Sequence, residues 1–291
     1  MRVAELYKKK RPVISMEFFP FRDDKTAESF NKTIDTLAPL NPDYLSVTFG
    51  AGGSTRDGSA QTINTIIKEK MLPCVAYIAG YGLSPDEICK VLDQYQAQGV
   101  ETIFILRGDK PKETDFMPHP KSFTHASDLI SFIRGHYDFN LGCAGYPEGH
   151  VEAQSLEKDI EYLKLKVENG AQYVVAQYFY DNAYFFNYEK QCRKAGIDVP
   201  IIPGIMPVYT LKMTRALSKI CGTKIPHVLG QKMDTIDGED KAAVLDLGIN
   251  FALDQCRELL EKGVSGLHFY TMNRSHSTRE IIRRLKLEGL L

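Results

Sequence analysis

Short apolar runs alternate with longer, charged stretches along the whole chain. Eight of these runs are rich in β-branched or aromatic residues, and each is followed by a loop that contains Gly, Pro or Asp. Runs of this length and composition predict buried strands, whereas the stretches between them have the periodicity of amphipathic helices. The predicted strands lie within residues 13–20, 44–53, 72–80, 102–109, 140–147, 173–181, 201–207 and 266–274.

The stretches between the strands have the end signals of helices. Residues 84–99 begin with Ser as an N-terminal cap, continue with Pro at the first helical position and end in Gly. Residues 24–37, 152–170 and 237–263 have similar helical periodicity, and one more helix is predicted between residues 208 and 234.

The alternation of strands and helices predicts an α/β protein with a mostly parallel sheet. Eight successive units predict a closed (β/α)8 TIM barrel, which typically takes about 250 residues as one domain. A doubly wound open sheet is the alternative, but the Gly-rich turn that usually follows its first strand is missing from "EFFPFRDD", residues 17–24. No linker or change in composition divides the chain, so a single domain is predicted over residues 1–291.

Composition and charge exclude several classes of protein. Hydrophobic residues make up 43% of the chain and charged ones 25%, as in ordinary globular proteins. The formal net charge is −1, so no general attraction to nucleic acid or to an anionic membrane is expected. No apolar run approaches the roughly 20 residues of a membrane span, and the N-terminus lacks the apolar segment of a signal peptide. The six cysteines form no C-x-x-C pair and are predicted to be free thiols in a cytoplasmic protein.

Polar side chains recur at the ends of the predicted strands. In a (β/α)8 barrel the carboxyl ends of the strands form the active site, so these side chains are expected to converge. The histidines have no metal-ligand spacing such as H-E-x-x-H, and no metal site is predicted. The strand-end side chains are Glu17, Thr48, Arg107, Asp109, Tyr146, His150, Gln177, Tyr270 and Arg274.

Glu17 is the most unusual of these residues, because it interrupts the apolar run "RPVISMEFFP", residues 11–20. At the mouth of a barrel, apolar walls that include Phe18 and Phe19 would raise the pKa of this carboxyl. A raised pKa would make Glu17 a proton donor near neutral pH. The alternative is a structural carboxylate paired with a cation such as Arg107.

A pair of charged residues on a predicted helix, Asp159 and Lys166, has two interpretations. The two are seven positions apart, so they share one helix face about two turns apart. Taken alone, this spacing favours a solvated face, and the alternative is a pair that grips a ligand over the mouth of the barrel. His268 shares the strand parity of Tyr270, so both are expected to point inward, with His268 as a core histidine whose hydrogen bonds are satisfied.

Two loops are candidates for ligand binding. Residues 50–55, "GAGGST", match neither a P-loop nor G-x-G-x-x-G, so a flexible loop is predicted there. Residues 110–123 form a Pro-rich loop whose length indicates a lid or binding segment. No Ser-His-Asp arrangement with a nucleophile elbow is present, which disfavours covalent hydrolysis. With Arg107 as a fork-like donor for phosphate, these features predict a planar, phosphate-bearing ligand.

Seven strings occur along the chain in a fixed order: SMEFFPFR, YLSVTFGAGGSTRD, ILRGD, AGYPEGHVEA, AQYFYD, IIPGIMP and HFYTMNR. Because of these strings and the alternation of eight predicted strands with helices, the chain resembles bacterial-type methylenetetrahydrofolate reductases over most of its length. The resemblance implies a flavoprotein with FAD in the barrel mouth, and self-association into a homo-oligomer. It also implies ping-pong hydride transfer, in which NADH or NADPH reduces the FAD. Methylenetetrahydrofolate is then reduced to 5-methyltetrahydrofolate, which supplies methyl groups for methionine synthesis.

The resemblance also assigns roles to individual residues. Glu17 is expected to protonate a folate nitrogen as the ring opens, Asp109 to bind the pterin and influence the flavin, and Gln177 to hydrogen-bond the pterin and the nicotinamide amide. The residues assigned to FAD are Thr48, Arg107, Gly108, Asp109, Ala126, Tyr146, His150, Ala153, Asp159 and Lys166. Those assigned to the folate substrate are Glu17, Asp109, Gln177, Tyr270 and Arg274.

Two positions depart from the family pattern. Cys74 stands where the third strand of the family often has His, and Leu217 stands where some members have an aromatic residue over the ligand. Both departures predict weaker contacts with flavin or substrate. Two alternative functions stay open: a barrel methyltransferase that binds a pterin without redox chemistry, and a non-catalytic subunit, which would not need Glu17, Asp109 and Gln177.

Overall fold

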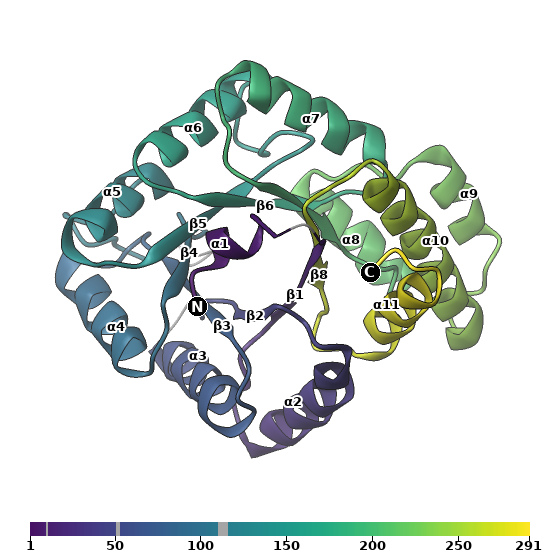
Figure 1. The fold of residues 1–291 in the computed structure, drawn as a ribbon, viewed down its shortest axis with the longest axis horizontal. Helices are drawn as coiled ribbons and strands as arrows, with labels where there is room; N and C mark the ends of the chain where they lie inside the picture. Colours follow the sequence, from purple (N-terminus) through teal and green to yellow (C-terminus); the bar gives the residue numbers. More distant parts are fainter. Residues whose placement is uncertain (10, 51–52, 110–115) are drawn as a thin grey trace.

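Eight parallel strands form the centre of the molecule (Figure 1). They pair in chain order, and the pairing of the first strand with the eighth closes the sheet into a barrel. The computed structural model describes residues 1–9, 11–50, 53–109 and 116–291. The strands are β1 Val13–Phe18, β2 Tyr44–Val47, β3 Cys74–Ala79, β4 Thr102–Leu106, β5 Asn140–Gly145, β6 Tyr173–Tyr178, β7 Ile201–Ile205 and β8 Gly266–Tyr270. Each lies within one of the eight predicted runs, so the predicted (β/α)8 barrel is confirmed.

Helices surround the barrel and connect its strands (Figure 1). They are α1 Val3–Leu6, α2 Asp24–Leu37, α3 Gly53–Asn64, α4 Pro85–Ala97, α5 Ala126–His136, α6 Leu156–Glu168, α7 Asn182–Lys194, α8 Leu211–Cys221, α9 His227–Asp234, α10 Lys241–Glu261 and α11 His276–Leu287. At the start of α4, the Ser84 side chain accepts a hydrogen bond from the backbone N–H of Glu87, and the Glu87 carboxylate accepts one from the backbone N–H of Ser84. This capping box, with Pro85 in the first turn, explains why α4 begins where the sequence predicts.

Alternate residues of each strand face the barrel interior and the surrounding helices. On β1, Ile14 and Met16 pack in the core that the barrel shares with its helices, whereas Val13 packs inside the barrel. Because side chains alternate along a strand, Ser15 and Glu17 share the inward face with Val13. The apolar interior at the amino end of the barrel includes Val3, Leu6, Val13, Tyr44, Val75, Tyr77, Phe104, Tyr173, Val175 and Ile202.

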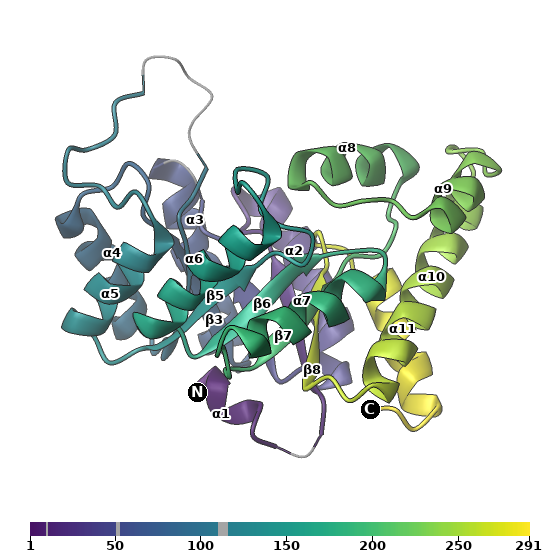
Figure 2. The same ribbon diagram turned by 90° about the horizontal axis from the view of Figure 1, so that it is seen from above.

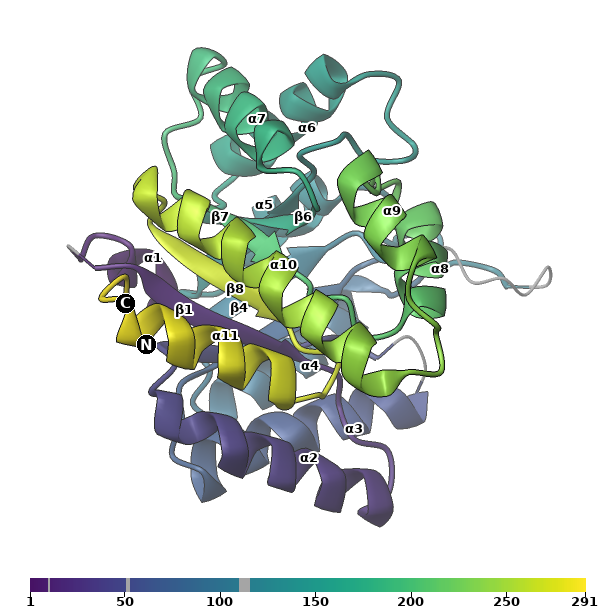
Figure 3. The same cartoon turned by 90° about the vertical axis from the view of Figure 1, so that its right-hand side faces the viewer.

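Helix α1 covers the amino end of the barrel and was not predicted. Its residues Val3 and Leu6 are buried, and the backbone N–H of Ala4 donates to the Asn140 side chain at 2.9 Å. A helix of four residues is too short to show a periodic pattern, so tertiary contacts hold it in place. Figures 2 and 3 show α1 and α8 at opposite ends of the barrel, which places α8 at the carboxyl ends of the strands.

The segment between β7 and α10 contains two helices, α8 and α9, where one was predicted. Gly222 ends α8 in the left-handed conformation, with φ of +72°, which glycine adopts most readily. Pro226, in an extended conformation, then occupies the position before the first residue of α9. This Gly and Pro divide one amphipathic stretch into two helices, and the sequence pattern did not show the division.

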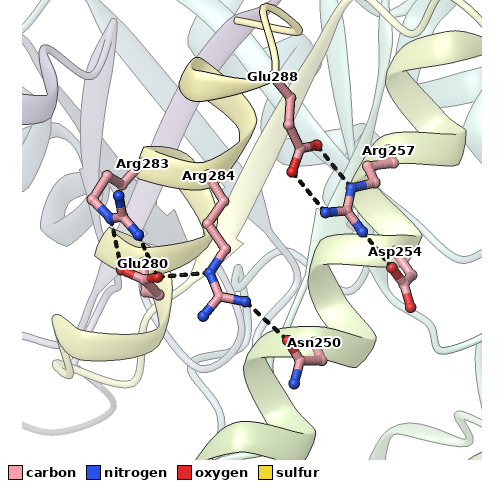
Figure 4. Close-up of polar contacts among 7 residues, drawn as sticks. All are labelled: Asn250, Asp254, Arg257, Glu280, Arg283, Arg284 and Glu288. Carbon is pink, nitrogen blue, oxygen red and sulfur yellow. Dashed lines mark hydrogen bonds and ion pairs between the residues drawn. The ribbon is translucent and has the colours of Figure 1, made fainter.

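Helices α10 and α11 lie side by side on the outside of the barrel (Figure 3). Arg257 of α10 forms a two-pronged pair with Glu288, with Nε to Oε2 at 2.8 Å and Nη2 to Oε1 at 2.6 Å (Figure 4). Arg284 of α11 donates to Asn250 of α10 at 3.0 Å and to Glu280 at 2.6 Å. These polar contacts fix the orientation of the two helices, while buried apolar side chains beneath them supply most of the stability.

Parts of the two predicted loops lie outside the described residues. These parts are residues 51–52 of the loop at 50–55 and residues 110–115 of the loop at 110–123. Helix α3 begins at Gly53, so the loop predicted over residues 50–55 is wrong for residues 53–55. Within the described ranges, no helix combines the length and the apolar character needed to cross a membrane. All six cysteines are free thiols.

Candidate active site

The predicted site residues lie at the carboxyl ends of the strands and on the segments that follow them. Glu17, Gln177 and Tyr270 belong to β1, β6 and β8. The others lie in the loops after β2, β4, β5 and β8 or on α5 and α6: Thr48, Arg107, Gly108, Asp109, Tyr146, His150, Ala153, Arg274, Ala126, Asp159 and Lys166. The closed parallel barrel therefore distributes these residues around one end, as the fold requires.

Glu17 lies beside a buried histidine inside the barrel. Its side chain is 14% exposed, and its Oε2 is 3.9 Å from Nε2 of His268, which is 1% exposed. The other ring nitrogen of His268, Nδ1, hydrogen-bonds the hydroxyl of Ser15 at 2.8 Å. Nε2 has no hydrogen-bond partner among the described residues. The prediction of a fully satisfied core histidine is therefore wrong for Nε2, whose nearest charged neighbour is the Glu17 carboxylate.

Arg107 pairs with Glu152 rather than with Glu17. Its Nη2 lies 3.1 Å from one carboxylate oxygen of Glu152, and its Nη1 contacts the other. Hydrogen bonding to Glu152 raises the pKa of the Arg107 guanidinium. An ion pair between Glu17 and Arg107, the structural alternative for Glu17, is therefore not formed, and no other Lys or Arg of the described residues pairs with Glu17.

Tyr77 is an inward residue of β3 that the charge of Glu17 affects, and it was not among the residues predicted for the site. Burial raises the pKa of the Tyr77 hydroxyl, and the charge of Glu17 raises it further. Cys74 is the first residue of β3, at the amino end, and packs in the outer core. The difference from the family pattern at Cys74 therefore lies away from the carboxyl ends of the strands, where the ligand was expected to bind. Strand parity could have found Tyr77, since Val75 and Tyr77 share the inward face.

Asp159 and Lys166 do not form a solvated helix face. Asp159 is 6% exposed, and burial raises the pKa of its carboxyl to about 6, against the opposing effects of the Lys166 charge and of a hydrogen bond from the backbone of His150. The ammonium of Lys166 donates to the carbonyl of Ala144 on β5 at 2.6 Å and lies 5.8 Å from the centre of the Tyr146 ring. The interpretation that spacing alone favoured is therefore wrong, because the loop after β5 covers this face.

Tyr146 and His150 form an aromatic corner next to these charges. Their ring centres are 4.7 Å apart and the rings meet nearly edge to face, at 79°. Burial, followed by the charge of Arg107, lowers the pKa of His150, which favours its neutral form. Two uncharged rings near the cations Arg107 and Lys166 suit a ligand that combines a planar ring with negative charge.

The loops after β2 and β4 bring backbone close to the mouth. Gly108 has φ of +89°, and a Cβ there would lie 3.0 Å from the Cβ of Ala79, so glycine is strongly favoured. Asp109, the next residue, is exposed. The backbone N–H of Thr48 donates to the carbonyl of Phe18 at 3.0 Å, which joins the loop after β2 to the end of β1.

The end of β8 is joined to the loop after β7. The hydroxyl of Tyr209 donates to the carbonyl of Tyr270 at 3.1 Å, and the guanidinium of the exposed Arg274 lies 5.6 Å from the Tyr209 ring centre. Leu217 of α8 packs against the neighbouring apolar cluster that includes Tyr178 and Tyr209. Among the described residues, no cluster of His, Cys, Asp or Glu could hold a metal ion.

Residues 2–286 match the family described as methylenetetrahydrofolate reductase. The chain is 34% identical over 272 residues to the 5,10-methylenetetrahydrofolate reductase of Escherichia coli, an alignment that covers 94% of this chain and 90% of that protein. It is also 34% identical over 282 residues to methylenetetrahydrofolate reductase 1 of Schizosaccharomyces pombe, covering 96% of this chain and 47% of that protein. The chain thus spans about half the length of this second relative.

A solved structure with the same fold comes from Clostridium thermocellum. It superposes with a TM-score of 0.68 and 15% identity, over the whole of both chains. Its description is an uncharacterised protein that binds two copies of 5-methyl-5,6,7,8-tetrahydrofolic acid. At this identity the likeness shows a shared fold.

Proposed function

The chain belongs to the methylenetetrahydrofolate reductase family, and on that premise we propose that it reduces 5,10-methylenetetrahydrofolate to 5-methyltetrahydrofolate. NADH or NADPH supplies the electrons in a ping-pong reaction through FAD. The observation that carries the proposal is the environment of Glu17, an inward carboxyl at the barrel mouth that pairs with no Lys or Arg of the described chain. The folate bound by the Clostridium thermocellum protein supports a folate ligand for a barrel of this kind.

The residues predicted to hold FAD have the chemistry that this cofactor needs. Arg107 and Lys166 offer positive charge for its diphosphate, and the glycine at position 108 lets backbone approach the ligand. Tyr146 and His150 offer ring surfaces. Bound FAD would carry hydride from the nicotinamide to the folate. Thr48, Asp109, Ala126, Ala153 and Asp159 complete the proposed cofactor set.

Glu17 is proposed to hold the proton that the folate substrate takes up. Opening of the five-membered ring of methylenetetrahydrofolate leaves a nitrogen that must be protonated, and a positioned carboxyl group can act as the acid. The nearest nitrogen of His268 lies 3.9 Å from this carboxyl, and the ring is itself held by Ser15, so the histidine occupies a fixed place beside Glu17. The proposed contacts to the substrate are Glu17, Asp109, Gln177, Tyr270 and Arg274.

A spectroscopic experiment tests this proposal against the two alternatives. The protein loaded with FAD should be yellow, lose its colour with NADH or NADPH in the absence of oxygen, and recover it when methylenetetrahydrofolate is added. A protein that cannot take up FAD would refute the proposal. Bleaching without recovery would indicate an electron-transfer subunit, and pterin binding without flavin would indicate a methyltransferase.

Substitution of Glu17 by Gln tests the role of its carboxyl group. Glu17→Gln should leave flavin reduction by NADH within about twofold and slow reoxidation by the folate by about 10²–10⁴-fold, the usual contribution of a general acid. Stopped-flow absorbance measures the two half-reactions separately. Glu261→Gln, a change at an exposed position on α10, should alter neither half-reaction. Equal losses in both half-reactions would make Glu17 a structural residue.

A further inference from the structure

Strand β6 contains one more residue than its neighbour at the barrel mouth. Val175 of β6 pairs with Ile202 of β7, but the next pair joins Tyr178 to Gly204. Three steps along β6 therefore correspond to two steps along β7, which is a β-bulge at Ala176 and Gln177. Bulges of this kind change the direction of a side chain near an active site.

Tyr270 reaches across β7 to hold this bulge. Its hydroxyl donates to the carbonyl of Ala176 at 3.1 Å, although β7 lies between β8 and β6 in the barrel. The crossing is possible because residue 204 of β7 is glycine. A Cβ there would lie 2.2 Å from the Ala176 carbonyl oxygen and 2.5 Å from Cε2 of the Tyr270 ring. The backbone of Tyr270 is itself held by the hydroxyl of Tyr209 at 3.1 Å.

The bulge also determines which end of the Gln177 amide is available to a ligand. The Gln177 side-chain oxygen, Oε1, accepts a hydrogen bond from the backbone N–H of Tyr178 at 3.0 Å. A backbone N–H can only donate, so the oxygen must occupy this position and the amide NH₂ is left as the other end. Gln177 therefore offers hydrogen-bond donors at the mouth.

We propose that the hydroxyl of Tyr270, as distinct from its ring, which belongs to the proposed substrate site, has a positioning role that acts through Gln177. By holding the Ala176 carbonyl, this hydroxyl fixes the bulge and so directs the Gln177 NH₂ group toward an acceptor atom of the ligand, such as a pterin nitrogen or a carbonyl oxygen. This inference rests on the proposed function for the identity of the ligand, whereas its structural part concerns the protein alone. Gly204 belongs to the same arrangement, because any larger residue would displace either the carbonyl or the ring.

Tyr270→Phe removes only the hydroxyl and is the variant that tests the proposal. Loss of this hydrogen bond removes a contact that holds the Ala176 carbonyl in place, so we expect about tenfold weaker binding of 5-methyltetrahydrofolate to the FAD-loaded protein. In a Gln177→Ala background the same change should weaken binding by less than about twofold, because the two residues act as one unit. Tyr95→Phe is the matched control: it removes another buried hydroxyl that donates to a strand carbonyl, that of Tyr77 at 3.4 Å, and should not change folate affinity. Equal losses in both backgrounds would show that Tyr270 acts independently of Gln177 and would overturn the proposal.

Hydrogen exchange in the protein without ligand tests the structural part separately. The amide of Tyr178 should exchange at least about tenfold faster in Tyr270→Phe than in the wild type or in Tyr95→Phe, because the bulge that protects it is loosened. Unchanged exchange would overturn the positioning role even if folate affinity fell. If the wild type bound neither FAD nor folate, the proposed function would fail, and the exchange measurement would still decide whether Tyr270 holds the bulge.

Discussion

Asp159→Asn should stabilise the cofactor-free protein at alkaline pH. Burial holds the pKa of the Asp159 carboxyl at about 6, against an ordinary value of 3.8. Each pKa unit corresponds to about 1.4 kcal/mol, so keeping this group ionised in the folded protein costs up to about 3 kcal/mol. Asn has nearly the same shape and is uncharged, so the substitution removes this cost without changing the packing of the side chain.

The pH dependence of this effect has a definite sign. Because the folded pKa is raised, the folded protein binds a proton more readily than the unfolded chain between about pH 4 and pH 6. The free energy of unfolding of the wild type therefore falls as the pH rises from about 4 to about 6. Above this range, the full cost of keeping Asp159 ionised is present. The difference in free energy of unfolding between Asp159→Asn and the wild type should be absent below about pH 4, about half of its maximum at pH 5, and constant above about pH 7.

Urea unfolding from pH 5 to pH 8, followed by circular dichroism, measures this difference. Asp254→Asn is a suitable control, because Asp254 is exposed and pairs with Arg257 on the outside of α10. It should not stabilise the protein at pH 8. An advantage of Asp159→Asn that does not change with pH, or a loss of stability at pH 8, would refute the argument that a buried charge is the cause. The same substitution should weaken FAD binding if Asp159 belongs to the cofactor site.

Two further predictions concern the stability of the fold. Phe179→Ala should lower the free energy of unfolding by about 3–5 kcal/mol in urea titrations, because Phe179 is fully buried and stacks on Phe185; a loss below about 1 kcal/mol would contradict this. Hydrogen bonds from Arg283 and Arg284 lower the pKa of Glu280 to about 2. The ionised Glu280 carboxylate therefore adds to the free energy of unfolding above the unfolded pKa of 4.5, and this stabilisation is lost as the pH falls toward 2. Glu280→Gln should cost about 1 kcal/mol at pH 7, since this pair is partly solvated, and nothing near pH 2; equal costs at both pH values would exclude a charge effect.

Local patterns in the sequence were sufficient to predict the barrel. Both faces of each strand are buried, so each strand must be a nearly continuous apolar run, and such runs are visible in the sequence. Helix α4 begins at the Ser and Pro that predict a helix start. Order along the chain then determined which strands pair, because consecutive parallel strands with right-handed crossovers become neighbours. The carboxyl ends of the strands follow from that order, which is why Glu17 was expected at the mouth.

The partners of the site residues depended on tertiary structure. Spacing placed Asp159 and Lys166 on one helix face but contained no information on the loop that buries it. The pairing of Arg107 with Glu152 joins two different loops, and no local pattern predicts such a contact.

The sequence by itself thus determined the barrel, its direction and the side chains that can reach its mouth. These features depend on hydrophobic periodicity, caps and strand order, all of which act over a few residues or between neighbouring elements. Only the tertiary structure decided that Tyr77 and His268 surround Glu17, and that Tyr270 reaches β6 over Gly204. Those contacts join strands that are far apart in the chain. Their geometry depends on which residues of each strand face the barrel interior, on the bulge in β6, and on the absence of a side chain at Gly204.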